Sequence, residues 1–373
     1  MTNSTHLALT NETQQALQLA LRARLPSPPN PSVGCLIPDS HGRILGQGHT
    51  QAAGGPHAEI MALRDAALKG HDVAGATAYV TLEPCSHHGR TGPCCDALIA
   101  AGIKKVVASI ADPNPLVAGQ GFARLRAAGI AVEVGPGAAE SRELNIGFFS
   151  RMVRKTPWVR MKVAASLDGK TALDNGASQW ITSDTARADG HAWRARSCAV
   201  LTGIGTVLED DPRLDVRLVD TPRQPHLVVV DSRLETPLDA QLFIPGRTIY
   251  IYAAEQNGAK KAALEARGAT VVYQPGVNGK VDLAAMLHDL ARREVNELHV
   301  EAGHKLNGSL IREGLVDEFL VYLAPKLIGQ GSGMASFGPI TELSHAVELD
   351  FRSSERLGPD LRIVARVRGR DSF

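Results

Sequence analysis

The stretch Thr81-Leu82-Glu83-Pro84-Cys85-Ser86-His87-His88-Gly89-Arg90-Thr91-Gly92-Pro93-Cys94 decides the fold of the first half of the chain. Cys85 follows an apolar, strand-like run, and Cys94 follows a proline that suits the first turn of a helix. Upstream, His57 opens a helical apolar pattern. One histidine and two cysteines provide three zinc ligands and leave a fourth tetrahedral position for water, as in a catalytic zinc site. We therefore predict that His57, Cys85 and Cys94 bind zinc.

Glu59 lies two residues after His57, where its carboxylate can move the protons of a water at the metal without binding the metal itself. Zinc nucleobase deaminases use a glutamate in this role, so the first half is predicted to remove an amino group from a heterocycle. Taken singly, a histidine followed by such a glutamate, or a buried cysteine, is usually ordinary packing. The combination of all four residues is what indicates a site.

Two alternatives stay open at the metal. Neighbouring side chains on a helix diverge by about 100°, so only one of Cys94 and Cys95 can face the zinc; we choose Cys94 and keep Cys95 as the alternative. The second alternative is a non-catalytic zinc module, in which His87 or His88 would close the fourth position.

The composition limits the classes of partner. The chain has 373 residues, enough for two domains, and 40 basic against 39 acidic side chains. A polynucleotide deaminase is the nearest rival function, and it would need a basic, aromatic-rich groove. Because aromatic residues make up only 4% of the chain and the charge is balanced, we predict a small-molecule substrate and no nucleic-acid or membrane partner.

The location is predicted from the N-terminus and the cysteines. The first ten residues are polar, and no apolar run approaches the roughly 18 residues of a membrane span. Five cysteines are an odd number and too sparse for a disulfide framework, which is typical of a reducing compartment. We therefore expect a cytoplasmic protein.

Strand-like and helical patterns alternate along both halves of the chain. The first half is predicted to hold a helix over residues 11–24, a strand pair around the turn at 39–42, and strands near 77–82, 105–110 and 130–134. The second half repeats the alternation from Val159 to Leu323. Glycines at 135 and 137 interrupt the pattern, and residues 151–155 are predicted to form a connection. The predicted domains are therefore 1–150 and 151–373, both α/β.

Over nearly its whole length the chain resembles the bifunctional deaminase-reductases of riboflavin biosynthesis. In the first half the resemblance rests on the stretch quoted above, on Pro29-Asn30-Pro31-Ser32-Val33-Gly34-Cys35 and on Gly55-Pro56-His57-Ala58-Glu59. In the second half it rests on Lys162-Val163-Ala164-Ala165-Ser166-Leu167-Asp168-Gly169-Lys170, Ser178-Gln179-Trp180-Ile181-Thr182-Ser183, Gly203-Ile204-Gly205-Thr206-Val207-Leu208-Glu209-Asp210-Asp211-Pro212, Val230-Asp231-Ser232 and Glu301-Ala302-Gly303.

The resemblance implies a fold, two cofactors and two consecutive reactions. The fold would be an N-terminal cytidine-deaminase-like α/β/α sandwich followed by a C-terminal dihydrofolate-reductase-like α/β domain, in a homodimer. The first domain would use zinc to deaminate 2,5-diamino-6-ribosylamino-4(3H)-pyrimidinone 5′-phosphate. The second would use NADPH to reduce the ribosyl group to ribityl, giving 5-amino-6-ribitylamino-uracil 5′-phosphate. The eight-residue gap between Cys85 and Cys94, longer than the two residues of the general deaminase signature, is normal in this family and holds the substrate.

The resemblance also implies site residues beyond the zinc ligands and Glu59. Substrate would contact Asn30, His87 and Arg90 in the first half, and Ser178, Arg194, Leu214, Arg217 and Glu301 in the second. NADPH would contact Ala164, Trp180, Thr206, Asp210, Ser232 and the run Gly303, His304, Lys305, Leu306, Asn307, Gly308 and Ser309. Lys162 is a candidate to hold or protonate the sugar, the alternative being an ordinary exposed lysine.

Local evidence for a nucleotide in the second half is weaker than the evidence for zinc in the first. Gly203-Ile204-Gly205 lacks the third glycine of a dinucleotide fingerprint. The run Gly303 to Gly308 is predicted as a loop between a strand and a helix, whose free amides would face a diphosphate. Without the resemblance, an ordinary strand-to-helix turn with solvated charges is the preferred interpretation. Arg233, beside Ser232, is predicted to receive the 2′-phosphate of NADPH, or else to be a solvated loop residue.

Overall fold

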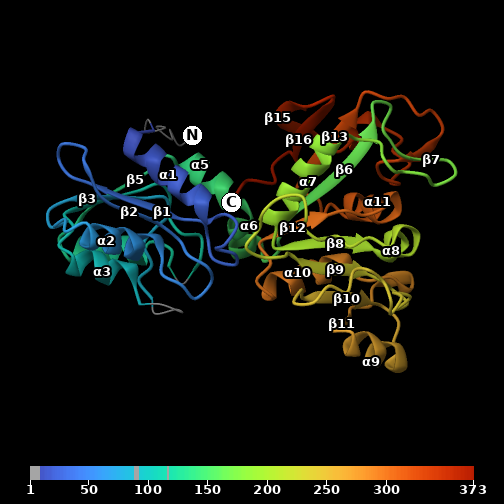
Figure 1. Cartoon of the computed structure of the whole chain (residues 1–373), viewed down its shortest axis with the longest axis horizontal. Coiled ribbons are helices and arrows are strands. Elements are labelled where there is room, and N and C mark those ends of the chain that lie inside the picture. The colour runs from blue at the N-terminus through green and yellow to red at the C-terminus, as the bar shows by residue number, and fades with distance from the viewer. Residues whose placement is uncertain (1–8, 88–91, 116) are drawn as a thin grey trace. The chain divides into compact units, whose positions relative to one another are not determined.

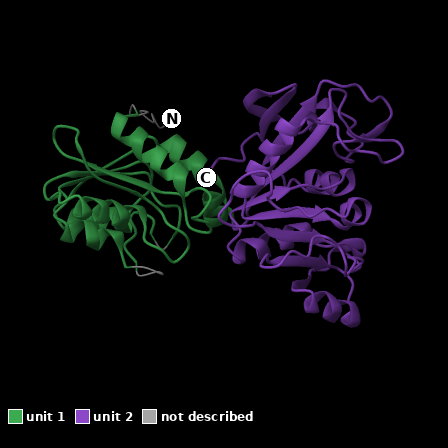
Figure 2. Cartoon of the chain, in the orientation of Figure 1, with its two compact units in different colours: residues 1–154 green, residues 155–373 purple. Residues whose placement is uncertain are grey.

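The structure is a computed structural model that describes residues 9–87, 92–115 and 117–373. The chain divides into two compact units, residues 1–154 and 155–373 (Figure 2). The sequence placed residues 151–155 in a connection, whereas the structure continues helix α6 (Ile146–Arg154) through Arg154. The helix forms because Ile146, Phe148 and Phe149 bury one face and leave the arginines on the other.

The first unit is built on one mixed sheet. Its strands run in the order β2-β1-β3-β4-β5: β1 (Gly34–Pro38), β2 (Ile44–His49), β3 (Thr77–Val80), β4 (Lys105–Ala108) and β5 (Ala131–Val134). Strand β1 pairs antiparallel with β2 and β3, while β3, β4 and β5 are parallel to one another.

Helices cover both faces of this sheet (Figure 1). They are α1 (Asn11–Ala23), α2 (Ala58–Leu68), α3 (Cys94–Ala100), α4 (Gln120–Ala127), α5 (Ala138–Leu144) and α6. Glycines allow the close approach: a Cβ on Gly34 would lie 2.0 Å from the Ala16 carbonyl of α1, and one on Gly48 would lie 2.6 Å from the Ala58 carbonyl of α2. Because Gly34 and Gly48 point to opposite faces, α1 and α2 lie on opposite sides. The predicted α/β/α sandwich is confirmed.

The second unit is built on a long sheet with the described order β11-β10-β9-β8-β12-β6-β13-β16-β15. Neighbours from β11 to β13 are parallel, and β16 and β15 close one edge antiparallel. The strands are β6 (Trp158–Ser166), β8 (Ala199–Gly203), β9 (His226–Val230), β10 (Ile249–Ala253), β11 (Ala269–Tyr273), β12 (Glu297–Val300), β13 (Glu318–Ala324), β15 (Leu349–Leu357) and β16 (Asp360–Val367), with β7 (Lys170–Leu173) and β14 (Gly331–Gly333) paired separately. The helices are α7 (Asp184–Arg196), α8 (Ile204–Asp210), α9 (Gly258–Ala266), α10 (Leu283–Arg292) and α11 (His304–Arg312), with short 3-10 turns η1 (Val277–Gly279) and η2 (Leu343–His345).

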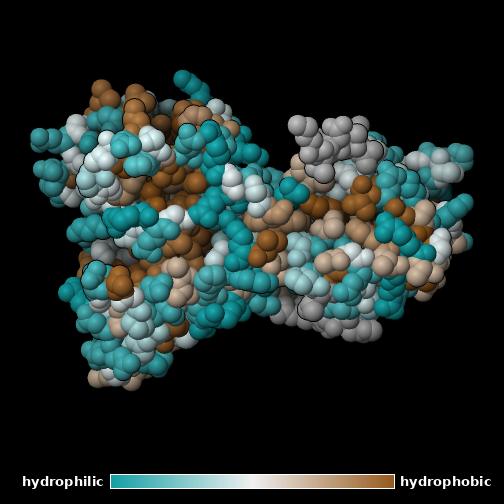
Figure 3. Space-filling view, turned by 180° about the vertical axis from the view of Figure 1, so that it is seen from behind, coloured by the Kyte–Doolittle hydropathy of each residue, from teal (hydrophilic) through white to brown (hydrophobic). Residues whose placement is uncertain are grey.

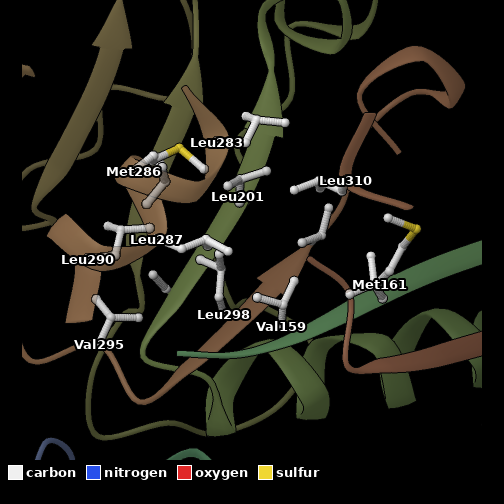
Figure 4. Packing of buried hydrophobic residues seen from close by; sticks show 14 of the residues in the cluster. Val159, Met161, Leu201, Leu283, Met286, Leu287, Leu290, Val295, Leu298 and Leu310 are labelled. Carbon is white, nitrogen blue, oxygen red and sulfur yellow. The ribbon is translucent and has the colours of Figure 1, made fainter. Parts of the chain in front are cut away.

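One face of this sheet is apolar. Leu201 and Leu298 lie beside Leu287 and Leu290 of α10, and Met161, from the next strand, lies toward Leu310 in the same cluster (Figure 4). Full burial of such side chains is worth about 1.5–3 kcal/mol each, so this core stabilises the packing of α10 and α11 on the central strands.

The opposite face, near α7, is polar along β6 and β12. Arg160 is fully buried and bonds Glu297 and Glu318 at 2.6 Å each. Two residues further along β6, Lys162 lies 3.6 Å from Glu301, which follows β12. Since side chains alternate between the faces of a strand, the same register that buries Met161 places these charged residues together.

Two features of the second unit differ from the sequence expectation. The run from Gly303 to Gly308 was predicted as a loop, but α11 begins at His304 and only Gly303 precedes it as the N-cap. The hairpin β15–β16 was not predicted, because β15 is exposed along most of its length and lacks an apolar alternation. None of the described helices is long and apolar enough to cross a membrane.

Candidate active sites

Three potential metal ligands meet in the first unit. The ligand atoms of His57, Cys85 and Cys94 all lie within 4.8 Å of one another. The Nδ1 atom of His57 is 3.6 Å from the Cys85 Sγ and 3.4 Å from the Cys94 Sγ. Zinc with bonds of about 2.0 Å to nitrogen and about 2.3 Å to sulfur would hold tetrahedral ligands about 3.5 Å apart. The donor set and its spacing therefore fit zinc.

Secondary structure positions each of these side chains. His57 is the N-cap of α2, Cys94 is the first residue of α3, and Cys85 lies in the turn after β3. The Cys94 backbone N–H donates to the Cys85 sulfur. Hydrogen bonds from Cys94, and then from His57, lower the pKa of Cys85 although burial raises it. The thiolate of this pair is therefore favoured at Cys85, while the hydrogen bond with Cys85, and then burial, raises the pKa of Cys94.

Cys95 does not face this cluster. Its thiol donates to the carbonyls of Pro84 at 3.2 Å and Gly121 at 3.5 Å. Burial raises the pKa of Cys95 to about 12. The structure therefore directs Cys94, rather than Cys95, toward His57 and Cys85.

Glu59 lies in the first turn of α2 and is buried. Burial, and then the charge of Cys85, raises the pKa of the Glu59 carboxyl to about 7. A carboxyl poised in this range both accepts and donates a proton near neutral pH. The same carboxyl interacts with the side chain of Cys94.

The other residues predicted in this half are placed less completely. Asn30 lies in the turn before β1, with its backbone bonded to Ser27. The Nδ1 atom of His87 is buried and has no hydrogen-bond partner among the described residues. Arg90 lies outside the described residues.

Sequence reasoning missed two carboxyl groups near the metal ligands. Asp112 is buried, and burial, followed by the charges of Glu83 and Cys85, raises its pKa to about 7. Glu83 is also buried and accepts hydrogen bonds from backbone amides. Glu83 stood in the quoted motif, but nothing in the sequence marked the distant Asp112.

In the second unit, predicted residues from three elements meet. Arg194 of α7 donates two hydrogen bonds to Glu301, from Nε to Oε1 and from Nη2 to Oε2, the second at 2.9 Å. The Nζ of Lys162 on β6 lies 3.6 Å from the same Oε2 atom. Burial raises the pKa of Glu301, but the charges of Arg194 and Lys162 outweigh burial and hold it well below its usual range. Glu301 is therefore an anion paired with two cations.

A loop beside Arg194 gathers further charge. Asp215 bonds both Arg213 and Arg217 at 2.8 Å, and its carbonyl accepts from Arg194. The Arg217 backbone N–H donates to His191 of α7. Burial, and then the charges of the nearby arginines, lowers the pKa of His191 to about 4. Leu214, within this loop, is buried with a φ of 51°. The sequence did not single out Asp215 or His191, because neither belongs to a motif with an evident spacing.

Several predicted cofactor residues lie near the carboxyl ends of the parallel strands of the long sheet. A Cβ on Gly303 would lie 3.7 Å from the Thr206 hydroxyl, and Leu306 lies against Gly203 at the end of β8. Gly303 caps α11 without a side-chain hydrogen bond, which leaves amides of the first turn open to an anion. Ligands of α/β sheets bind at this carboxyl edge of parallel strands.

Orphaned polar atoms support a ligand at this edge. Among the described residues, the buried Thr202 Oγ1 and Asn307 Oδ1 have no hydrogen-bond partner. Gly308 has a different explanation, because a Cβ there would lie 1.8 Å from the Ser336 carbonyl. The Thr202 hydroxyl and the open amides at the start of α11 are donors that fit a phosphate, whereas the Asn307 Oδ1 can only accept a hydrogen bond, and Gly308 is required for packing.

The remaining predicted residues are spread around this edge. Ala164 follows Lys162 on the same face of β6, Asp210 ends α8, and Ser232 follows β9. Trp180 is exposed with Arg187 over its ring, and Ser178 lies in the loop after β7. Arg233 is exposed and forms three hydrogen bonds with the Glu235 carboxylate, so any 2′-phosphate contact would compete with that pair. His304, Lys305 and Ser309 belong to the first two turns of α11.

Both halves match known protein families. Residues 9–110 match the cytidine and deoxycytidylate deaminase zinc-binding region, and residues 157–363 match the RibD C-terminal domain. The riboflavin biosynthesis protein RibD of Escherichia coli is 45% identical over 93% of this chain and 96% of its own length. The chain belongs to the RibD family of riboflavin biosynthesis proteins. The RibD of Aquifex aeolicus is 40% identical over 95% of this chain and 97% of its own length.

Solved structures agree with the family assignment. The RibD of Acinetobacter baumannii has a TM-score of 0.86 and 38% identity, covering 95% of this chain and 98% of its own. A diaminohydroxyphosphoribosylaminopyrimidine deaminase/5-amino-6-(5-phosphoribosylamino)uracil reductase from Thermotoga maritima has a TM-score of 0.84 and 31% identity, covering 95% and 97%. The family confirms an enzyme of riboflavin biosynthesis with a zinc-dependent deaminase followed by an NADPH-dependent reductase.

Proposed function

We propose that the first unit deaminates 2,5-diamino-6-ribosylamino-4(3H)-pyrimidinone 5′-phosphate and that the second reduces the resulting ribosyl group to ribityl. The observation that carries the proposal is the His57, Cys85 and Cys94 cluster with buried Glu59 in the adjoining helical turn. Family relatives with the same two domains support the order of the reactions.

In the deaminase unit, His57, Cys85 and Cys94 would hold zinc, which lowers the pKa of a bound water toward about 7. Glu59 would accept one proton from the attacking water and donate it to a ring nitrogen, and would then carry a second proton, from the added hydroxyl, to the departing amino group, which leaves as ammonia. Its burial beside Cys94 keeps bulk water from replacing it as the proton carrier. Asn30, His87 and Arg90 would contact the substrate.

In the reductase unit, NADPH supplies a hydride when bound near α11. Lys162, whose Nζ lies 3.6 Å from Glu301, would bond and protonate the sugar oxygen. The Arg194 guanidinium donates hydrogen bonds to the Glu301 carboxylate and to the Asp215 carbonyl, so its main role would be to hold the Glu301 side chain in position. Arg217, about half exposed, would hold the 5′-phosphate. Ser178 and Leu214 would complete the substrate contacts.

Metal analysis tests this function against a structural zinc module. The purified chain is expected to carry about one zinc held by three protein ligands, and chelation should abolish ammonia release from the diamino substrate. A fourth protein ligand, or ammonia release that is unchanged after complete metal removal, would overturn the proposal.

We further propose that the enzyme is a homodimer in the cytoplasm. Apolar patches interrupt the hydrophilic surface in Figure 3. Leu343 and Phe351 are 94% and 78% exposed, and Phe351 lies on the edge strand β15. Exposed apolar side chains, one of them on an edge strand, can pack against a second copy. Analytical ultracentrifugation should show a dimer that Phe351→Glu weakens; a monomeric parent chain would contradict the dimer assignment.

The cytoplasmic location is supported by the cysteines, because reduced thiols at Cys85 and Cys94 are typical of a reducing compartment.

A further inference from the structure

Glu83 makes contacts that the catalytic scheme does not use. Its buried carboxylate accepts four backbone hydrogen bonds: Oε2 from Asp112 and Gly119 at 3.1 and 2.9 Å, and Oε1 from Gly121 and Phe122 at 2.9 and 3.2 Å. We call this set the Glu83 cap. No lysine or arginine bonds Glu83 among the described residues, so backbone amides balance its charge.

The Glu83 cap replaces a missing helix cap. Helix α4 begins after Gly119, which has no side chain to cap it. Gly121 and Phe122 are the second and third residues of α4, whose amides an N-cap side chain normally binds. Glu83 therefore caps α4 from 38 residues away in sequence, as the separation between Glu83 and Gly121 gives.

The same residue is tied to the metal-binding turn. Glu83 is separated from Cys85 only by Pro84, and a Cβ on Gly121 would lie 2.0 Å from the Pro84 carbonyl. That carbonyl also accepts from the Cys95 thiol at 3.2 Å. The start of α4 is thus in direct contact with the peptide that precedes Cys85.

We propose that Glu83 is a positioning residue for deamination, which holds the Cys85 turn and the segment that carries Asp112 in one fixed arrangement. The proposal rests on the deaminase function proposed above. Charge-assisted hydrogen bonds are about twice as strong as neutral ones, and a buried acceptor leaves no water to replace them. Glu83 would therefore limit movement of Cys85 relative to Asp112 without touching substrate.

Glu83→Gln in the full chain tests the proposal, with Glu133→Gln as the matched control because Glu133 is partly exposed and forms an ion pair with the exposed end of Lys105. The glutamine keeps the shape but turns an NH₂ group toward backbone N–H donors. We expect deamination per bound zinc to fall by about tenfold or more, while reduction of the deaminated intermediate stays unchanged. The control variant should match the parent in both reactions.

A spectroscopic readout separates positioning from stability alone. With cobalt in place of zinc, the visible absorption of the metal–thiolate site should change in Glu83→Gln at a temperature where the protein is fully folded, and should stay the same in Glu133→Gln. Parent-like deamination per bound metal in Glu83→Gln would overturn the proposal. Failure of the parent chain itself to deaminate would instead overturn the proposed function.

A measurement on the unmodified chain covers the case in which Glu83→Gln does not fold. Hydrogen exchange should show slow amides at Asp112, Gly119, Gly121 and Phe122, although Asp112 and Gly119 lie outside helices and strands. Exchange of the Asp112 and Gly119 amides as fast as that of the exposed turn at His41 and Gly42 would overturn the Glu83 cap.

Discussion

Glu59 and the cysteines separate chemistry from metal binding at the scale of single residues. Glu59→Gln should keep about one zinc per chain but lose at least 10²-fold to about 10⁴-fold in deamination, because the proton carrier is gone and the ligands remain. Cys94→Ser should lose the metal. Cys95→Ser is the matched control and should retain it, since Cys95 bonds Pro84 instead. Zinc content and ammonia release measure these effects; near-native ammonia release by Glu59→Gln would refute its role.

Cofactor choice depends on another single residue. We predict at least about tenfold preference for NADPH over NADH in kcat/KM, since one charge-assisted phosphate contact contributes about 1.5–3 kcal/mol. Arg233→Ala should reduce this preference, mainly through the KM for NADPH. Glu235→Gln should increase the preference for NADPH, because the Glu235 carboxylate forms an ion pair with the Arg233 guanidinium and competes with the 2′-phosphate. Steady-state kinetics with both cofactors decides; equal use by the parent enzyme would contradict the assignment.

The sequence identifies residues whose chemistry and spacing are distinctive, and misses those that act through the fold. His57, Cys85 and Cys94 stand in motifs whose ligand types are rare together. Asp215 and His191 come close to the predicted site residues only because the 213–217 loop packs against α7 in the folded chain. No periodicity in the sequence predicts that contact.

Strands β6, β12, β13 and β16 share a buried ion network at the scale of elements. Arg160 bonds Glu297 and Glu318, and Arg366 bonds Glu318 at 2.8 Å. Arg160→Met should lower the free energy of unfolding by about 3–5 kcal/mol, because it leaves two buried carboxylates short of a partner. Arg368→Met, which removes exposed ion pairs, should cost about 0–1 kcal/mol. Denaturant unfolding compares the two; equal losses would refute the role of burial.

The same network predicts a pH dependence of stability. Burial raises the pKa of Glu318, but Arg160 and Arg366 outweigh burial and hold it below its ordinary value of 4.5. A folded pKa below the unfolded one gives stability that is present above about pH 4.5 and lost as the pH falls through the folded value. The free energy of unfolding should fall less on acidification in Arg160→Met than in the parent. An equal or larger loss, measured by unfolding across this range, would contradict the sign.

Elements with strong apolar patterns were predictable, and elements defined by their partners were not. The buried strands β8 and β9 appear in the sequence as continuous apolar runs. Strand β15 exists because β16 pairs with it, and its own residues are mostly exposed. Helix α11 begins five residues earlier than the predicted Ser309, because the glycine before His304 serves as its N-cap.

Two separate cores imply two separable units at the scale of the whole molecule. The apolar face of the long sheet lies wholly within residues 155–373. A fragment beginning at Arg151 should therefore fold and reduce the deaminated intermediate with NADPH, with no need for zinc. The control is the full chain treated with chelator, whose reductase activity should persist while it remains folded. A fragment that folds but does not reduce the intermediate would contradict this division.

The central claim is that one chain deaminates first and reduces second. The most direct test follows ammonia release and NADPH oxidation in one sample of purified chain with the diamino substrate. Without NADPH, ammonia should be released and the ribosylaminouracil phosphate should accumulate. With NADPH, its oxidation should lag behind ammonia release and yield the ribitylaminouracil phosphate. NADPH oxidation without ammonia release, or no reaction of the diamino substrate at all, would contradict the account.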